Sequence, residues 1–160
     1  MPISLKVDIG RQLITVLDGR KALHSYPVST ALNGAGEMSG SGCTPRGKHK
    51  VKIKIGAGEP ENTVFIGRRP TGEIYTPSLA VQYPERDWIL TRIIWLTGTE
   101  STRNRGGDVD TLRRYIYIHG CPDTEPMSTP CSHGCIRMRN SDLIALFEQI
   151  ENGTAVEIVE

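Results

Sequence analysis

Residues 115–140 read YIYIHGCPDTEPMSTPCSHGCIRMRN, and this stretch holds two of the four histidines and three of the four cysteines of the 160-residue chain. The aromatic and β-branched run at 115–118 predicts a strand that delivers His119 at its end. A loop rich in proline, serine and threonine follows, and we expect it to return the chain so that Cys135 comes near His119. Because side chains alternate along an extended backbone, His133 and Cys135 should share one face.

A cysteine beside a histidine is a source of thiolate. A free thiol, with a pKa of about 8.5, is mostly protonated at neutral pH, and a neighbouring imidazolium can lower that pKa to about 3.5–7.5. The same imidazole can return a proton to a leaving amine, which suits acyl transfer. Gly134 permits a close approach of substrate, and the backbone N–H groups of Gly134 and Cys135 are the candidate donors to an oxyanion.

Three other interpretations of the cysteines stay open at this point. A structural zinc site has enough donors nearby, but only the pair Cys131 and Cys135 has roughly the usual ligand spacing. A disulfide between Cys121 and Cys131 would close the loop and leave Cys135 free. The third interpretation is that the cysteines are small buried hydrophobic residues, which is the common fate of a free cysteine.

Two segments, Ile118-His119-Gly120 and Ser132-His133-Gly134-Cys135-Ile136-Arg137-Met138, resemble the signature of the L,D-transpeptidase (YkuD-like) catalytic domain. The resemblance implies a cysteine acyl-transferase that acts on peptidoglycan stem peptides. Cys135 would be the nucleophile and His119 the proton acceptor and donor, while His133 and Arg137 would shape the site and hold a substrate carboxylate, with support from Ser132. The predicted catalytic residues are Cys135, His119 and His133, and the predicted substrate- or oxyanion-binding residues are Ser132, Gly134, Arg137 and Gly120.

Cys121 marks a departure from this resemblance, because many members have a threonine after the His-Gly pair. Any role of that hydroxyl in positioning His119 is therefore not carried over to this chain. Neither a metal nor a cofactor is expected. Cys43, Cys121 and Cys131 are expected to be individually dispensable for activity.

The composition excludes several classes of partner. Lysine and arginine total 19 against 18 aspartates and glutamates, so no net field attracts nucleic acid or membrane. Local basic groups such as Arg68-Arg69 are interpreted as solvated faces. No segment approaches the roughly 20 apolar residues that span a bilayer. The length predicts one domain, residues 1–160, and we expect a monomer.

The first residues, MPISLKVDIG, lack the charged and apolar regions of a secretory signal and lead directly into a predicted strand. A cytoplasmic protein is therefore expected, with a periplasmic location as the alternative if a signal was removed. Four cysteines without an obvious pairing framework fit the reducing cytosol.

The remaining pattern predicts a mainly β fold, a sandwich or barrel-like domain with one substantial helix near the C-terminus. Asn140-Ser141 is expected to cap that helix, and Trp88 and Trp95 are expected to anchor the core. The spacing of turn formers and of alternating apolar residues predicts strands at 3–9, 13–17, 22–28, 48–55, 87–97 and 154–159, of which the first three form a meander, and a helix at 141–151.

Three predicted connections bear on a site. The glycine-rich segment 33–42 lacks the spacing of a phosphate-binding loop and is interpreted as a flexible connection. Residues 56–78 are expected to line or cover the site. Residues 98–111 are interpreted either as a mobile flap beside the site or as an ordinary surface loop. Arg103, Arg105, Arg113 and Arg114 could meet anionic groups of a stem peptide. His49, at a predicted strand start, is interpreted as a surface or strand-end histidine.

The predicted activity is cleavage of a stem tetrapeptide through a thioester on Cys135, with release of the terminal D-alanine. Hydrolysis by an L,D-carboxypeptidase that recycles soluble muropeptides is favoured. The alternative within the family is periplasmic cross-linking of peptidoglycan. Alternatives of another class are a zinc-binding protein and a muropeptide-binding module without catalysis.

Overall fold

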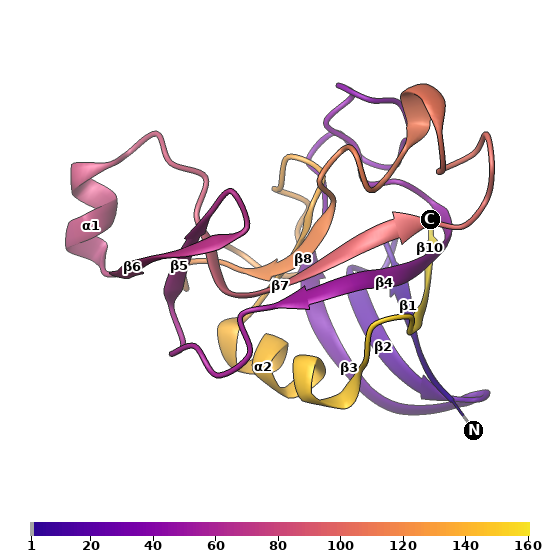
Figure 1. Ribbon diagram of the computed structural model, residues 1–160, viewed down its shortest axis with the longest axis horizontal. Helices are drawn as coiled ribbons and strands as arrows, with labels where there is room; N and C mark the ends of the chain where they lie inside the picture. The colour runs from indigo at the N-terminus through magenta and orange to yellow at the C-terminus, as the bar shows by residue number, and fades with distance from the viewer. Residues whose placement is uncertain (1) are drawn as a thin grey trace.

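The computed structural model describes residues 2–160, in which ten strands form one curved sheet (Figure 1). The order along the sheet is β4-β10-β1-β2-β3-β9-β8-β7-β5-β6, and β4 also pairs with β7, so the sheet closes on itself. The predicted mainly β, barrel-like fold is confirmed. The strands and helices are β1 (Ile3–Asp8), β2 (Leu13–Asp18), β3 (Lys21–Ser29), β4 (Gly47–Ile55), β5 (Thr63–Ile66), β6 (Arg69–Ile74), β7 (Ile89–Gly98), β8 (Tyr117–Gly120), β9 (Ile136–Met138) and β10 (Ala155–Val159), with α1 (Pro77–Gln82), the 3-10 turn η1 (Gly107–Val109) and α2 (Asn140–Gln149).

The first three strands form the predicted antiparallel meander, with Leu5 opposite Val16 and Val7 opposite Ile14. These four side chains are buried, whereas Lys6 between them is exposed. The final strand β10 lies parallel to β1 and continues the same alternation. The period of two in the sequence is therefore what assigns one face of these strands to the core.

Helix α2 contributes its apolar side to the main core. Leu143, Leu146 and Phe147 are buried and belong to one cluster with side chains of β1, β2, β7, β8, β9 and β10. Figure 1 shows α2 lying beneath the curved sheet, and the helix packs against β7 and β8. A closed sheet leaves no free edge in this region, and the helix removes its remaining apolar surface from water. No helix among residues 2–160 has the length and hydropathy needed to cross a bilayer.

The parallel pairing of β8 with β9 positions the residues that the sequence singled out. Ile118 lies opposite Ile136 and His119 lies opposite Arg137. Cys135 immediately precedes β9, so it reaches the neighbourhood of Tyr117 and His119 on the adjacent strand. A parallel pair needs a long connection, and residues 121–135 provide it.

The prediction that Trp88 and Trp95 anchor the core is confirmed only in part, because Trp95 packs against the cluster of Phe65, Ile93 and Tyr117 from its margin. Trp88 and Trp95 are both only partly buried: Trp88 packs edge-on against Tyr75, and Trp95 donates from Nε1 to the Leu112 carbonyl at 3.1 Å. Their indole N–H groups favour such boundary positions over a wholly apolar core.

The end of segment 56–78 begins a short helix, α1, which the sequence pattern did not predict. Thr76 caps this helix, and Pro77 is in its first turn.

Asn140 does not cap α2 as predicted. The N-cap residue is Arg139, without a side-chain cap, and Asn140 is buried as the first residue of the helix. Its Oδ1 accepts a hydrogen bond from Thr91 Oγ1 at 2.7 Å, and its Nδ2 donates to Cys121 O at 3.0 Å and to Asn62 Oδ1 at 3.1 Å. The amide therefore joins α2 to three other segments, and these contacts outweigh a local cap.

Replacement of Asn140 by alanine should lower the free energy of unfolding by about 2–3 kcal/mol, because the buried Thr91 hydroxyl and Cys121 carbonyl would lose their hydrogen bonds to Asn140. Urea unfolding of the purified variant measures the loss. Asn152 provides a control, since its exposed Oδ1 accepts one hydrogen bond from the Lys54 backbone. Equal losses for Asn140→Ala and Asn152→Ala would contradict this account.

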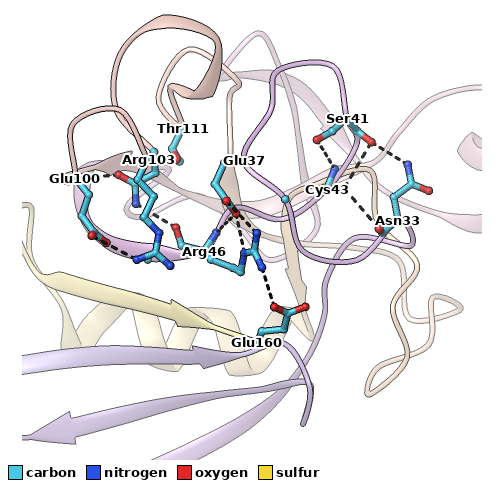
Figure 2. A network of polar contacts seen from close by, with 12 residues as sticks. Asn33, Glu37, Ser41, Cys43, Arg46, Glu100, Arg103, Thr111 and Glu160 are labelled. Atoms are coloured by element: carbon cyan, nitrogen blue, oxygen red, sulfur yellow. Dashed lines mark hydrogen bonds and ion pairs between the residues drawn. The ribbon is translucent and has the colours of Figure 1, made fainter.

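Segment 98–111 is attached to the start of β4, contrary to the prediction of a flap beside the site. Asn104 Nδ2 donates to the carbonyls of Arg46 and Lys48 at 3.1 and 3.0 Å, and Glu100 accepts from the Lys48 N–H at 2.7 Å. Figure 2 shows Glu100 and Arg103 of this segment near Arg46, which itself pairs with Glu37 and Glu160. The polar side chains that suggested a mobile segment, such as Glu100 and Asn104, make these hydrogen bonds.

His49 is buried, so its interpretation as a surface residue was wrong. Its Nε2 lies 2.9 Å from Thr111 Oγ1 and its Nδ1 lies 3.0 Å from Gly47 O. Burial lowers the pKa of His49 to about 4, although the hydrogen bond to Gly47 opposes that shift. The histidine is therefore a neutral link between β4 and the segment that precedes β8.

Acidification should destabilise the protein through His49. The unfolded chain binds a proton to this histidine near pH 6.5 and the folded chain only near pH 4, so stability is lost as pH falls through that interval. The expected loss between pH 7 and pH 5 is about 2 kcal/mol. Urea unfolding at both pH values measures it, and His49→Gln should flatten the dependence. An unchanged dependence in that variant would refute the assignment.

Candidate active site

Cys135 lies at the wall of a cavity, with its side chain partly exposed. The Tyr117 N–H donates to its sulfur at 3.3 Å, and the thiol donates to Tyr115 O at 3.3 Å. Side chains of a second apolar cluster, Phe65, Ile93 and Tyr117, pack beneath it. The sulfur is thus held against the β8 backbone while one side faces the cavity.

His119 lines the same cavity from β8 and is almost wholly buried. Its Nδ1 lies 2.7 Å from the carbonyl oxygen of Gly120, which can only accept a hydrogen bond. The proton of the neutral ring is therefore on Nδ1, and Nε2 is left as an acceptor. This arrangement suits a base that removes a proton from a neighbouring thiol.

Burial favours the neutral form of both the Cys135 thiol and the His119 imidazole. It raises the pKa of the Cys135 thiol to about 11, against the opposing hydrogen bond from Tyr117, and it lowers the pKa of His119. A resting pair of neutral thiol and neutral imidazole follows, in place of the ion pair that a cysteine next to an imidazolium would form.

Alkylation of Cys135 by iodoacetamide should consequently be slow at pH 7 and should accelerate by about tenfold per pH unit toward pH 11, because the thiolate is the reacting species. Mass spectrometry of the labelled peptide follows the rate, with Cys135→Ala to identify the site. A rate that is already maximal below pH 8 would instead indicate a thiolate–imidazolium pair.

Ser132 and Gly134 organise the turn that carries the cysteine. The Ser132 hydroxyl donates to Cys135 O and accepts from the Gly134 N–H at 3.2 Å. The Gly134 carbonyl accepts from Thr44 Oγ1 at 2.9 Å, and the φ of Gly134, +133°, is unfavourable for any residue with a Cβ. Because the Gly134 N–H is engaged, the Cys135 N–H is the stronger of the two candidate oxyanion donors.

Gly120 is buried within β8 and is not among the residues that line the cavity. A Cβ at this position would meet Asn140 Oδ1 and would lie 2.7 Å from Leu90 O. The glycine therefore allows two segments to approach β8, and its carbonyl orients His119. Its place in the structure is that of a positioning residue.

Arg137 and His133 meet at a carboxylate that sequence analysis did not single out, Asp87. The nearly buried guanidinium of Arg137 pairs with Asp87 at 3.2 Å and with Glu125 at 3.4 Å, while His133 Nδ1 lies 3.6 Å from Asp87 Oδ2. His133 is 78% exposed. No sequence pattern pointed to Asp87 as a site residue, because it lies in an irregular segment about 30 residues or more before the motif.

The cavity beside Cys135 has a volume of about 300 Å³, within the range of small-molecule sites. A second cavity of about 230 Å³ adjoins it, and Asp87, His133 and Arg137 line both. Of the seven predicted site residues, five line the larger cavity, namely His119, Ser132, His133, Cys135 and Arg137, whereas Gly120 and Gly134 do not. No residue of 98–111 lines either of these two cavities, whereas Gly67 and Arg68 of the predicted covering excursion do line the larger one.

The alternative arrangements of the cysteines are also resolved by the geometry. Cys43, Cys121, Cys131 and Cys135 are all free thiols, so the structure contains no Cys121–Cys131 disulfide. Among residues 2–160, no group of three or more histidine, cysteine, aspartate or glutamate side chains is arranged to hold a metal ion. Burial raises the pKa of Cys121 to about 11.

A barrel-like sheet with a histidine on β8 and a cysteine directly before the parallel strand β9 defines the class, and comparison with known proteins agrees. The model of the YkuD family, L,D-transpeptidase catalytic domain, matches residues 2–158. The chain therefore belongs to this family.

Solved structures share the fold at low sequence identity. An L,D-transpeptidase from Xylanimonas cellulosilytica is similar with a TM-score of 0.62 and 17% identity, over 98% of this chain and 60% of that one. An L,D-transpeptidase from Mycobacterium smegmatis is similar with a TM-score of 0.58 and 15% identity, over 99% and 59%. This chain accordingly spans about three fifths of the length of these proteins.

A more local similarity in sequence joins this chain to a curated protein. The probable L,D-transpeptidase YbiS of Escherichia coli strain K12 is 37% identical over 49 residues. The match covers 31% of this chain and 16% of that protein.

Proposed function

We propose that this protein is a cysteine acyl-transferase that acts on peptidoglycan stem tetrapeptides and releases the terminal D-alanine. The observation that carries the proposal is that Cys135, directly before β9, and His119, on the paired strand β8, line the same cavity of an L,D-transpeptidase catalytic domain. A nucleophile and a base that face the same small cavity are what acyl transfer needs.

The proposed first step forms the acyl-enzyme. Cys135 Sγ bonds to the carbonyl carbon of the third residue of the stem while its proton passes to His119 Nε2. The Cys135 N–H stabilises the oxyanion. Collapse of the tetrahedral intermediate breaks the C–N bond to D-alanine, whose nitrogen receives the proton from His119, and leaves a thioester.

Resolution of the thioester decides the product. With water as the acceptor, His119 takes one proton from it, the third residue regains a carboxylate, and the thiol is restored. With the side-chain amine of another stem as the acceptor, a cross-link forms. We propose hydrolysis, and a cytoplasmic role in recycling soluble muropeptides. The four free thiols support this location, since they fit a reducing compartment.

Incubation of the purified protein with a disaccharide tetrapeptide, followed by mass spectrometry, tests the proposal. A tripeptide product with free D-alanine supports hydrolysis. Dimers linked through two diaminopimelates would assign the cross-linking activity, which the similarity to the E. coli protein favours. Binding of the tetrapeptide without any turnover would indicate a non-catalytic binding module.

A further inference from the structure

Three arginines line the cavity beside Cys135. One of them already forms ion pairs, and a second already donates hydrogen bonds to backbone carbonyls. Arg137 pairs with Asp87 and Glu125. Arg114 donates to backbone carbonyls of the glycine-rich segment and its neighbour: to Gly36 and Glu37 from Nη1, and to Cys43 at 2.6 Å from Nη2. Neither guanidinium can take a substrate carboxylate without giving up these contacts.

Arg68 is the third arginine, and its surroundings are different. Its guanidinium lies 5.1 Å from the ring centroid of Trp95 and 4.9 Å from that of Tyr115, and it donates to Tyr117 Oη at 3.3 Å. Among residues 2–160, no carboxylate forms an ion pair with it. Aromatic faces hold a cation in place without neutralising it, so most of its N–H donors remain available.

The backbone of the β5–β6 hairpin presents this side chain to the cavity. Ile66 pairs with Arg69, so Gly67 and Arg68 form a two-residue turn with φ values of +58° and +65°. Such turns favour glycine, asparagine or aspartate at both positions, because at positive φ a Cβ crowds the backbone and most side chains gain no local hydrogen bond in return. Arginine is thus a locally unfavourable choice at a position next to the nucleophile, which is where strain is commonly retained for function.

We propose that Arg68 is the carboxylate-binding residue of this cavity, and that it recognises an anionic peptide by a bidentate pair with one of its carboxylates. The inference rests on the proposed function and names a specificity-determining residue for it. The planar guanidinium suits a carboxylate, and the rings of Trp95 and Tyr115 fix its plane before substrate arrives. Sequence analysis had assigned Arg68 and Arg69 together to a solvated face.

Two carboxylates of a stem tetrapeptide have this chemistry: the terminal carboxylate of D-alanine and the side-chain carboxylate of the third residue, diaminopimelate. The test therefore uses the tetrapeptide and two analogues, one with a C-terminal amide and one with lysine in place of diaminopimelate. Calorimetric binding is measured in the Cys135→Ala background, so that turnover does not interfere. Arg68→Met keeps the apolar stem and removes the charge, and Arg68→Lys keeps the charge without the planar fork.

Arg68→Met should weaken binding of the tetrapeptide by about 10- to 100-fold, and Arg68→Lys by less. The analogue that lacks the recognised carboxylate should bind the Arg68 protein as weakly as the tetrapeptide binds the Arg68→Met protein, and Arg68→Met should not weaken it further. That comparison identifies which carboxylate is bound. Arg69→Met is the matched control, because Arg69 is exposed, belongs to the same hairpin and does not line the cavity.

Two outcomes overturn the inference alone: equal binding by the Arg68→Met and Arg69→Met proteins, or an equal loss for all three peptides, which would indicate a structural effect of the hairpin. Failure of the parent protein to bind any of the peptides would overturn the proposed substrate and this inference together. Circular dichroism and thermal unfolding verify that each variant is folded.

Discussion

Replacement of Cys135 by alanine should abolish release of D-alanine, with a fall in rate on the order of 10⁴-fold or more, because no other group can form the thioester. The fold should be retained. The thiol is small and partly exposed, and water can replace its contacts with the backbone of Tyr115 and Tyr117. Release of D-alanine from a tetrapeptide measures the loss, and intact-protein mass spectrometry should detect an acyl adduct on the parent protein only.

Cys131→Ala is the matched control for this variant, since Cys131 is also partly buried and lies in the same stretch of the chain but does not line the cavity. Its activity should stay close to that of the parent protein, as should that of Cys43→Ala and Cys121→Ala. Turnover by Cys135→Ala at more than a few per cent of the parent rate would remove the cysteine from the mechanism.

Replacement of His119 by alanine should cost nearly as much activity, because nucleophile and base act as a unit. The pH dependence distinguishes this loss from a folding defect. Since burial raises the pKa of Cys135 to about 11, the thiolate forms without a base only at high pH. The first step in His119→Ala, measured as acyl-adduct formation, should therefore recover steadily as pH rises toward 11, whereas Cys135→Ala should form no adduct at any pH.

His133→Ala serves as the control in the same experiment. His133 is 78% exposed and contacts Asp87, so its loss should reduce activity less than loss of His119 and should not change the shape of the pH profile. Equal losses of activity in the two variants, or a pH profile of His119→Ala that does not rise, would show that His119 is not the base. Thermal unfolding of each variant at pH 7 provides the stability comparison.

Local sequence patterns predicted much of the fold. The alternation of apolar residues in β1, β2 and β10 predicted both the strands and the face that is buried, since each strand has one face in the core. The pattern of 115–140 pointed to His119, Ser132, His133, Cys135 and Arg137, which the structure places around one cavity. The core position of Trp88, the helix cap at Asn140 and the surface position of His49 were predicted wrongly, because each depends on partners distant in the sequence.

The flap assigned to 98–111 illustrates the same limit. Its polar residues suggested solvent exposure, but Asn104 and Glu100 bind the backbone of β4, which lies about 50 residues earlier in the chain. Asp87 and Arg68 were missed for a related reason. Neither belongs to a motif, and each becomes part of the site only through the folded sheet.

The sequence by itself determined the family and the mainly β fold, and it predicted the pair of Cys135 and His119, because strand periodicity and a compact motif are local properties. Tertiary structure alone decided the charge state of that pair and the partners around it. Burial keeps both groups neutral, Asp87 engages Arg137, and the β5–β6 hairpin brings Arg68 to the cavity. Desolvation and ion pairing depend on which atoms surround a group in space, and neighbours in the sequence do not specify those atoms.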